Sequence, residues 1–219
     1  MIDFSIEPSK TALLIIDMQN VFVEGSPVSA PEGPQVLQRL NHLAGVCHEV
    51  GIQVIYTAHV VRPDHSNIGI LGKVIPPVQE GLIDDGSTSA RLHAGVQVRE
   101  GDIVLKKPRY GAFHGTDLEL LLRQKGIDTL IIGGIATNVC PETTAREAMV
   151  RDFKVLFLSD GTATFGLPDL GFGPVTAQEV QRVTCSVLGF FFGQVLSVDQ
   201  VLQKLRTCQP PLEQEQEWK

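Results

Sequence analysis

The sequence contains no apolar run near the roughly 20 residues that a membrane-spanning helix needs. Its first residues, Met-Ile-Asp-Phe-Ser, lack the basic start and the apolar centre of a secretory signal. Positive charge is also in short supply, since the net charge is −7 and the isoelectric point is about 5.3. Nothing therefore points to a polyanionic partner. We expect a cytoplasmic protein that binds neither membrane nor nucleic acid.

Cysteine is scarce, and its four copies are Cys47, Cys140, Cys185 and Cys208. Their spacing forms no Cys-x-x-Cys pair and no Cys/His cluster of the zinc-finger kind. Scattered thiols of this sort are typical of a reducing compartment. We expect Cys47 and Cys185 to be buried structural thiols and Cys208 to be incidental, in a C-terminal tail.

Short apolar runs alternate with helical patterns along the whole chain. Continuous apolar runs, as opposed to alternating ones, indicate strands that are buried on both faces, as in parallel sheets. Strands are predicted at 11–17, 52–57, 102–105, 130–132, 154–158 and 190–196. Helices are predicted at 35–50, 116–125, 141–151, 176–188 and 198–205. This order predicts a single three-layer α/β/α domain over residues 1–208, Rossmann-like, with an open, mainly parallel six-stranded sheet. A polar tail at 209–219 follows it.

Two local features carry further predictions. Residues 58–100 show no clear periodicity, and a loop of this length in a compact domain is usually functional. We expect a lid or a subunit contact there, with short helical turns. Thr116 and Glu119 have the Thr-x-x-Glu spacing of a capping box, which predicts the start of a helix.

Three side chains with reactive chemistry fall at or just past predicted strand ends, namely Asp17, Lys107 and Cys140. Ligands of open parallel sheets bind at the carboxyl ends of the strands, so these three should meet. Cys140 precedes Pro141 at the predicted start of a helix, where free N–H groups and the helix dipole favour a thiolate. Taken singly, each residue has a plainer interpretation: a capping carboxylate, a solvated lysine and a small buried hydrophobe.

The sequences around these residues resemble the isochorismatase-like cysteine hydrolases. The matching motifs are Asp-Met-Gln-Asn at 17–20, Lys-Pro-Arg-Tyr-Gly-Ala-Phe at 107–113 and Gly-Ile-Ala-Thr-Asn-Val-Cys at 134–140. The resemblance extends from about residue 11 to 165. It implies a catalytic triad of Asp17, Lys107 and Cys140, a cis peptide at Ile135–Ala136, and an oxyanion hole formed by the backbone N–H groups of Ala136 and Cys140.

The same resemblance implies that an amide or ureide is hydrolysed through a thioester on Cys140. Isochorismate hydrolases, which cleave a vinyl ether, do not use this cysteine, and residues 107–146 look most like the ureidoacrylate, biuret and carbamoyl-amide hydrolases. The Asp-x-His metal motif of nicotinamidases is missing after the second strand. We therefore expect no metal or other cofactor, and His59 and His65 as surface loop histidines. A homo-oligomer, a dimer or a tetramer, is implied by the family alone.

Residues near the triad in sequence are predicted to contact the substrate: Gln19, Phe22, Tyr110, Phe113 and Asn138. Packing of the loops is an equal alternative for Phe22 and Phe113. Asn138, with Thr137, is expected mainly to hold the turn. Glu142 and Arg146 are spaced for an ion pair along one helix.

Two other functions remain open at this point. The chain could be a catalytically silent relative that serves as a binding or assembly module. It could also be a redox or detoxifying protein that uses Cys140, although no resolving cysteine lies nearby in the sequence.

Overall fold

A six-stranded sheet forms the centre of the structure, a computed structural model that describes residues 2–207. Its strands are β1 (Thr11–Ile16), β2 (Gln53–His59), β3 (Ile103–Lys107), β4 (Thr129–Ile135), β5 (Lys154–Ala163) and β6 (Gln194–Leu196). All neighbours pair in parallel, in the order β3-β2-β1-β4-β5-β6. The predicted open parallel sheet is confirmed.

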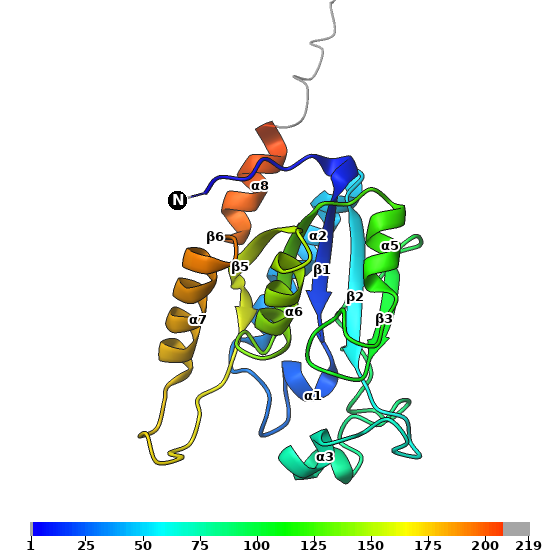
Figure 1. Ribbon diagram of the computed structural model, residues 1–219, viewed down its shortest axis with the longest axis vertical. Helices are drawn as coiled ribbons and strands as arrows, with labels where there is room; N and C mark the ends of the chain where they lie inside the picture. Colours follow the sequence, from blue (N-terminus) through cyan, green and yellow to red (C-terminus); the bar gives the residue numbers. More distant parts are fainter. Residues whose placement is uncertain (1, 208–219) are drawn as a thin grey trace, which may run out of the picture.

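Helices cover both faces of this sheet (Figure 1). One face packs against α2 (Gly33–Glu49) and α8 (Val198–Thr207), and the other against α5 (Leu118–Gln124), α6 (Cys140–Met149) and α7 (Ala177–Phe191). Three short helices complete the fold: α1 (Asn20–Val23), α3 (Leu71–Val74) and α4 (Pro76–Gln79), preceded by the 3-10 turn Pro8–Lys10. The arrangement is the predicted three-layer α/β/α fold.

The central strand β1 shows why the two layers hold together. Leu13 and Ile15 point into the cluster of α2 and α8, whereas Leu14 and Ile16 point into the cluster of α5, α6 and α7. All four side chains are buried, and each large apolar side chain buried in this way contributes about 1.5–3 kcal/mol. A strand buried on both faces gives the residue that follows it, Asp17, a rigid support.

The order of the strands places a crevice beside β1. The chain runs outward from β1 to β3 and then returns to the other side of β1 as β4. The connection after β1 leads to α2 on one face, and β4 leads directly to α6 on the other. At such a switch point the connections diverge and leave room for a ligand at the carboxyl ends of the strands.

Strands β1 and β4 approach each other closely at this point. Ile16 is in register with Gly134, which has a φ of +128°. A Cβ atom at residue 134 would collide with the backbone carbonyl of Ile16. Glycine is therefore needed here both for its conformation and for the space it leaves.

The structure corrects several predicted strand boundaries: β4 extends over Thr129–Ile135, and β5 continues to Ala163. Strand β2 continues to His59 and does not end at Thr57, because the pairing with β3 persists to the last residue of that strand. The sixth strand covers 194–196 only, since Phe190 and Phe191 form the end of α7.

The predicted capping box at residues 116–119 is wrong. Helix α5 begins at Leu118, and the hydroxyl of Thr116 donates to the Ala112 carbonyl instead. A reciprocal capping box starts α7, where Thr176 and Glu179 exchange hydrogen bonds. Both segments have the Thr-x-x-Glu spacing. In the first, the Thr116 hydroxyl is instead hydrogen-bonded to the Ala112 carbonyl within the loop before α5.

Residues 60–92 fold over the carboxyl ends of the strands, and Figure 1 shows α3 beyond the tips of β1 and β2. Residues 95–101 then run beside α2 to the start of β3. The covering segment, residues 60–92, contains the short helical turns predicted for it, α3 and α4. Its apolar side chains form a separate small cluster with Val21 of α1. The members from the covering segment are Val61, Ile68, Leu71, Val78 and Ile83. The segment is thus packed against the region where the crevice opens.

The remaining sequence predictions concern the thiols and the tail. Cys47 is buried as expected, but Cys185 is only half-buried. Cys208 and the predicted tail at 209–219 lie outside the described residues. Within residues 2–207, no helix has the length and apolar character needed to cross a membrane.

Candidate active site

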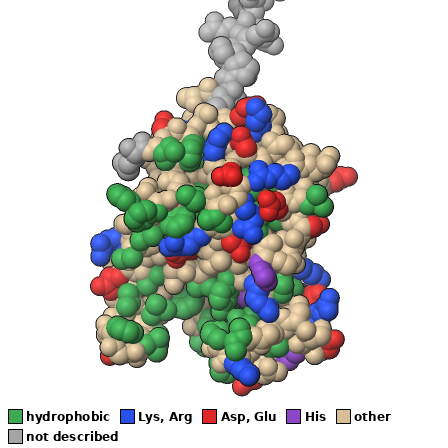
Figure 2. All heavy atoms as spheres, in the orientation of Figure 1, with side chains coloured by type: hydrophobic (Ala, Val, Ile, Leu, Met, Phe, Trp, Pro, Cys, Tyr) green, Lys and Arg blue, Asp and Glu red, His purple; other side chains and the backbone are tan. Residues whose placement is uncertain are grey.

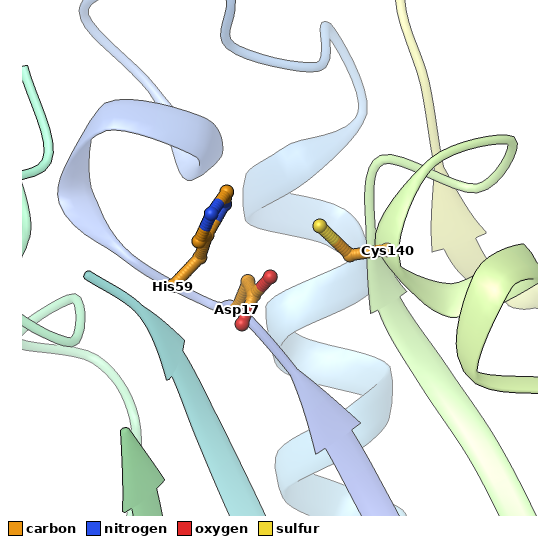
Figure 3. Close-up of side chains that lie close together, drawn as sticks. All are labelled: Asp17, His59 and Cys140. Atoms are coloured by element: carbon orange, nitrogen blue, oxygen red, sulfur yellow. The ribbon is translucent and has the colours of Figure 1, made fainter. Parts of the chain in front are cut away.

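Strand ends on both sides of the crevice deliver the predicted residues to one place. Asp17 follows β1, Lys107 is the last residue of β3, and Cys140 is the first residue of α6. Figure 3 shows Asp17 and Cys140 together with His59, the last residue of β2, their side chains converging on one point. Because His59 pairs with Lys107 in the register of β2 and β3, the two residues are neighbours.

Asp17 and Lys107 form a buried ion pair. Lys107 Nζ lies 2.7 Å from Asp17 Oδ2, and neither side chain has any exposed surface. The contact is close but poorly aligned for a hydrogen bond, so Oδ2 has no directional donor among the described residues. Burial alone would lower the pKa of Lys107, but the adjacent Asp17 and Cys140 outweigh it and raise that pKa. Lys107 is therefore a permanent cation of the site.

Two backbone carbonyls complete the surroundings of the ammonium. Lys107 Nζ donates to the carbonyl of Arg109 at 3.0 Å and to that of Tyr110 at 2.8 Å. The loop that follows β3 thus folds back around its own terminal lysine. These two hydrogen bonds fix the ammonium beside Asp17.

Thr57 on β2 orients the carboxylate from the other side. Its hydroxyl donates to Asp17 Oδ1 at 2.6 Å, and its backbone carbonyl accepts from the Asp17 N–H at 3.1 Å. Asp17 has a φ of +52°, which is uncommon for a residue with a side chain. The contacts with Thr57 and Lys107 hold it in this conformation.

Cys140 presents its thiol to this ion pair from the N-terminus of α6. The residue is 4% exposed. Burial, with the Asp17 carboxylate, raises the pKa of the Cys140 thiol above its ordinary value, and Lys107 opposes this only in part. Lys107 and the start of α6 favour a thiolate, as the sequence predicts, but burial acts against them. The low dielectric of the buried site outweighs the cation and the helix dipole, so the thiol keeps its proton until a base removes it.

The turn between β4 and α6 carries the candidate oxyanion donors. The Ile135–Ala136 peptide is cis, as the family resemblance predicts. Among the backbone hydrogen bonds of residues 2–207, neither the Ala136 N–H nor the Cys140 N–H donates to a carbonyl. The turn itself is held through its neighbours, since Thr137 N donates to the Ala163 carbonyl at 2.9 Å and Asn138 Oδ1 accepts from Thr164 at 2.6 Å.

His59 is the functional candidate that the sequence did not reveal. It is not a surface loop residue: it ends β2, is 3% exposed, and contacts the Tyr110 ring edge-to-face with centroids 5.6 Å apart. Burial, with the nearby Lys107, lowers its pKa to about 4, so the ring is neutral at physiological pH. The placement of the strand end at Thr57 hid this residue. His65 does lie in a loop, paired with Asp84 at 3.0 Å.

A small cavity of about 140 Å³ opens directly beside Cys140. Its walls come from the turn after β4, from α1 and from the covering segment, and almost all of them are apolar: Phe22, Val28, His59, Leu71, Ile75, Val78, Leu82, Ile83, Tyr110, Ile135, Ala136, Val139, Cys140 and Phe165. Figure 2 shows the surface hollowed at its lower edge, between two lobes with hydrophobic walls. A wider, polar hollow near His48, at the opposite edge of the sheet, has no cysteine among its described lining residues.

The cavity includes some of the predicted contact residues and omits others. Phe22 and Tyr110 line it, whereas Gln19, Phe113 and Asn138 do not. Gln19 is fully buried and binds backbone: its amide donates to the Ala90 carbonyl at 2.6 Å and its Oε1 accepts from the His59 N–H at 2.8 Å.

Two further predicted contact residues, Phe113 and Asn138, make contacts within the protein. Phe113 stacks on Phe153 at 5.7 Å within the core, and Asn138 holds the turn. These contacts fit the packing alternative for Phe113 and the turn-holding role expected for Asn138. The predicted ion pair along α6 is confirmed, since Arg146 lies 2.6 Å from Glu142.

The cluster also contains atoms that metals bind. Carboxylate, imidazole and thiol atoms of Asp17, His59 and Cys140 all lie within 4.8 Å of one another. The ammonium of Lys107 already contacts the same carboxylate, however, and places a positive charge where a cation would have to sit. This donor set therefore suits proton transfer better than metal binding.

Comparisons with known proteins agree with this geometry. The isochorismatase domain model matches residues 11–169. The chain is 33% identical over 181 residues to the ureidoacrylate amidohydrolase RutB of Methylorubrum extorquens, covering 73% of this chain and 72% of that protein. It is 32% identical over 198 residues to nicotinamidase 3 of Arabidopsis thaliana, covering 89% and 88%. A crystal structure of a cysteine hydrolase from Pseudomonas syringae superposes with a TM-score of 0.90 at 32% identity, covering 94% of this chain and 96% of that one.

Proposed function

Because the chain belongs to the isochorismatase family, we propose that it is a cysteine amidohydrolase that cleaves the C–N bond of a small amide or ureide. The observation that carries this proposal is the position of Cys140, buried beside the Asp17–Lys107 pair and at the wall of an apolar cavity. Relatives named as amidohydrolase and nicotinamidase support amide chemistry.

Asp17 acts as the general base in the first half of the reaction. As Cys140 Sγ attacks the carbonyl carbon, the thiol proton passes to the carboxylate, whose Oδ2 has no aligned donor. A C–S bond forms and the carbonyl π electrons move to oxygen. The backbone N–H groups of Ala136 and Cys140 stabilise this oxyanion, and one such donor is typically worth about 2.7–4 kcal/mol.

The tetrahedral intermediate then collapses. The C–N bond breaks as Asp17 returns the proton to the leaving nitrogen, which departs as ammonia or an amine and leaves a thioester. Water attacks the thioester, Asp17 takes a proton from it, and the C–S bond breaks to release the acid and restore the Cys140 thiol. Lys107 stays protonated throughout, and its charge stabilises the Asp17 carboxylate in each resting state.

This mechanism explains how a thiol of raised pKa can be the nucleophile. A pre-formed thiolate is unnecessary when a carboxylate in contact with the thiol removes the proton during attack. The same property counts against a redox-sensing role, because reactive redox cysteines depend on a depressed thiol pKa. The intact Asp17, Lys107 and Cys140 set counts against a catalytically silent binding module.

Release of ammonia or amine from a panel of small amides and ureides tests the proposal. Wild-type protein should hydrolyse at least one of them, and rapid acid quench with mass spectrometry should trap an acyl group on Cys140. Cys140→Ala should have no turnover, whereas Cys185→Ala, which changes a half-buried thiol outside the site, should keep it. Equal rates for wild type and Cys140→Ala on every substrate would rule the proposal out.

Self-association belongs to the same proposal. We expect a dimer or a tetramer, as in the family, with no metal or cofactor required for turnover. Light scattering after size-exclusion chromatography gives the mass of the assembly.

Prolonged dialysis against a chelator should leave the rate unchanged, and recovery of a lost rate by added zinc would contradict a metal-independent mechanism.

A further inference from the structure

Among the described residues, the cavity beside Cys140 has no charged side chain that could bind a charged substrate. Its described lining residues include no Lys, Arg, Asp or Glu. The nearest charges, Asp17 and Lys107, neutralise each other at 2.7 Å. Arg109, the next cation along the chain, is directed to the backbone carbonyls of Asn67 and Pro108. A carboxylate placed in this cavity would therefore be buried without a partner, which is strongly unfavourable.

His59 supplies an unused polar side-chain atom at the cavity wall. Its Nε2 is buried and has no hydrogen-bond partner, while its backbone is clamped by Gln19 and its ring by Tyr110. We assign the ring proton to Nδ1, which can be shared with the nearby Pro108 carbonyl, and the free lone pair to Nε2, which has no partner among the described residues. The free atom is therefore an acceptor, and it needs a donor from a ligand.

The position of this acceptor indicates which ligand atom would donate a hydrogen bond to it. Atoms of His59, Asp17 and Cys140 lie within 4.8 Å of one another, and Figure 3 shows the imidazole and the thiol on either side of Asp17. In the reaction proposed above, the leaving nitrogen must contact Asp17, which protonates it. An amide nitrogen in that position lies near the His59 imidazole as well.

We propose that the site takes an uncharged primary carboxamide with a compact apolar substituent, and that His59 Nε2 accepts a hydrogen bond from its amide nitrogen. The inference rests on the amidohydrolase function proposed above and narrows its substrate class. A primary amide has two N–H groups, one for Asp17 and one for His59. A secondary amide has one, and a tertiary amide has none. The apolar substituent occupies the cavity walls formed by the covering segment, such as Leu71, Val78 and Ile83.

Wild-type protein and a matched set of substrates test the substrate class without any mutation. Butyramide and succinamate have acyl chains of similar length and differ in the terminal carboxylate. We expect kcat/KM for butyramide to exceed that for succinamate by at least about 100-fold, because the carboxylate finds no partner. N-methylbutyramide should be slower than butyramide, and N,N-dimethylbutyramide should not react. Equal or faster hydrolysis of succinamate overturns the apolar preference.

The role of His59 is separated from mere packing by an ester with the same acyl group. Methyl butyrate has no N–H at the leaving atom. His59→Phe should lower kcat/KM for butyramide by about 10- to 100-fold and leave methyl butyrate within a few-fold of wild type. His59→Gln offers a carbonyl oxygen as an acceptor and should recover part of the butyramide rate. His42→Phe, at an exposed position on α2, is the matched control.

The outcomes distinguish this inference from the function on which it rests. If neither variant of His59 folds, as judged by circular dichroism, the wild-type series of primary, secondary and tertiary amides still decides the case. Equal losses on the amide and the ester would assign His59 a packing role and reject the inference while the amidohydrolase function stands. No turnover of any amide by the wild type overturns both.

Discussion

The carboxylate of Asp17 and the ammonium of Lys107 meet at 2.7 Å across the end of an intervening strand. Asp17 follows β1, Lys107 ends β3, and β2 runs between them with Thr57 and His59 at its own end. The pair has no exposed surface. Its charges are therefore strongly coupled, and the site can hold a base next to a neutral thiol without exposing either to water.

Neighbouring lysines on β3 provide a matched test of this pair. Lys107→Met leaves Asp17 buried without its cation. We expect turnover to fall by about 100-fold or more, and the pKa of Cys140 to rise further. Lys106→Met removes only an exposed pair with Asp85 and should be nearly silent. Turnover and pH-dependent alkylation of the thiol measure both effects.

Loss of the buried partner also costs stability, about 3–5 kcal/mol for pairs of this kind, so Lys107→Met must be shown to be folded before its rate is interpreted. An alkylation profile identical to that of the wild type in a folded variant would contradict the assigned role of Lys107.

The Thr57 hydroxyl should matter for rate as well as for stability. Thr57→Val keeps the shape of the side chain but removes the donor to Asp17 Oδ1. We expect kcat to fall by about 10-fold and the free energy of unfolding to fall by about 1–2 kcal/mol. Thr11→Val removes a comparable hydrogen bond to the Glu7 carbonyl at the far end of β1 and should affect stability alone. Identical kcat changes in the two variants would show that Thr57 has no special part in the site.

Protonation of His59 should destabilise the fold in acid. Its pKa is about 4 in the folded protein against an ordinary value of 6.5, so between these values the unfolded chain binds a proton that the folded chain does not. The free energy of unfolding therefore decreases as the pH falls from 6.5 to 4, by about 3 kcal/mol at roughly 1.4 kcal/mol per pKa unit.

Urea unfolding at pH 7 and at pH 4.5 measures this change in the free energy of unfolding. His59→Gln should lose less stability between the two values than the wild type does, whereas His42→Gln, at an exposed position, should match the wild type. The same pH dependence in His59→Gln and the wild type would mean that the imidazole titrates normally. Comparison of variants cancels the contribution of the carboxylates.

Two glycines test the close approach of β1 and β4. Gly134→Ala places a methyl group against the Ile16 carbonyl at a φ of +128°, and we expect a loss of more than about 2 kcal/mol in the free energy of unfolding. Gly45→Ala, within α2, meets only the end of the Arg99 side chain at 3.8 Å and should stabilise the protein by about 0.5–1 kcal/mol. Chemical denaturation of both variants checks the prediction. A Gly134→Ala variant as stable as the wild type would mean that the two strands can move apart.

Local patterns in the sequence were sufficient to predict the fold and the meeting of three reactive side chains. Continuous apolar runs such as Leu13–Ile16 are buried on both faces, and that burial is what makes a parallel sheet. Asp17, Lys107 and Cys140 follow strand ends, and the ends of parallel strands share one edge, so their meeting could be inferred before any coordinates were known. Local pattern failed at boundaries, as at Thr116. Its hydroxyl donates to the Ala112 carbonyl and accepts from the Leu118 N–H, and no capping box with Glu119 forms.

Only the tertiary structure decided the state of the site and its selectivity. The neutral thiol of Cys140, the neutral imidazole of His59 and the apolar cavity all follow from burial by the covering segment, which is distant in sequence from α6. Desolvation depends on every atom packed around a group, and no local motif contains that sum. The sequence by itself determined that Asp17, Lys107 and Cys140 would meet at this edge of the sheet. Which amides the site admits is determined by the residues that fold over it.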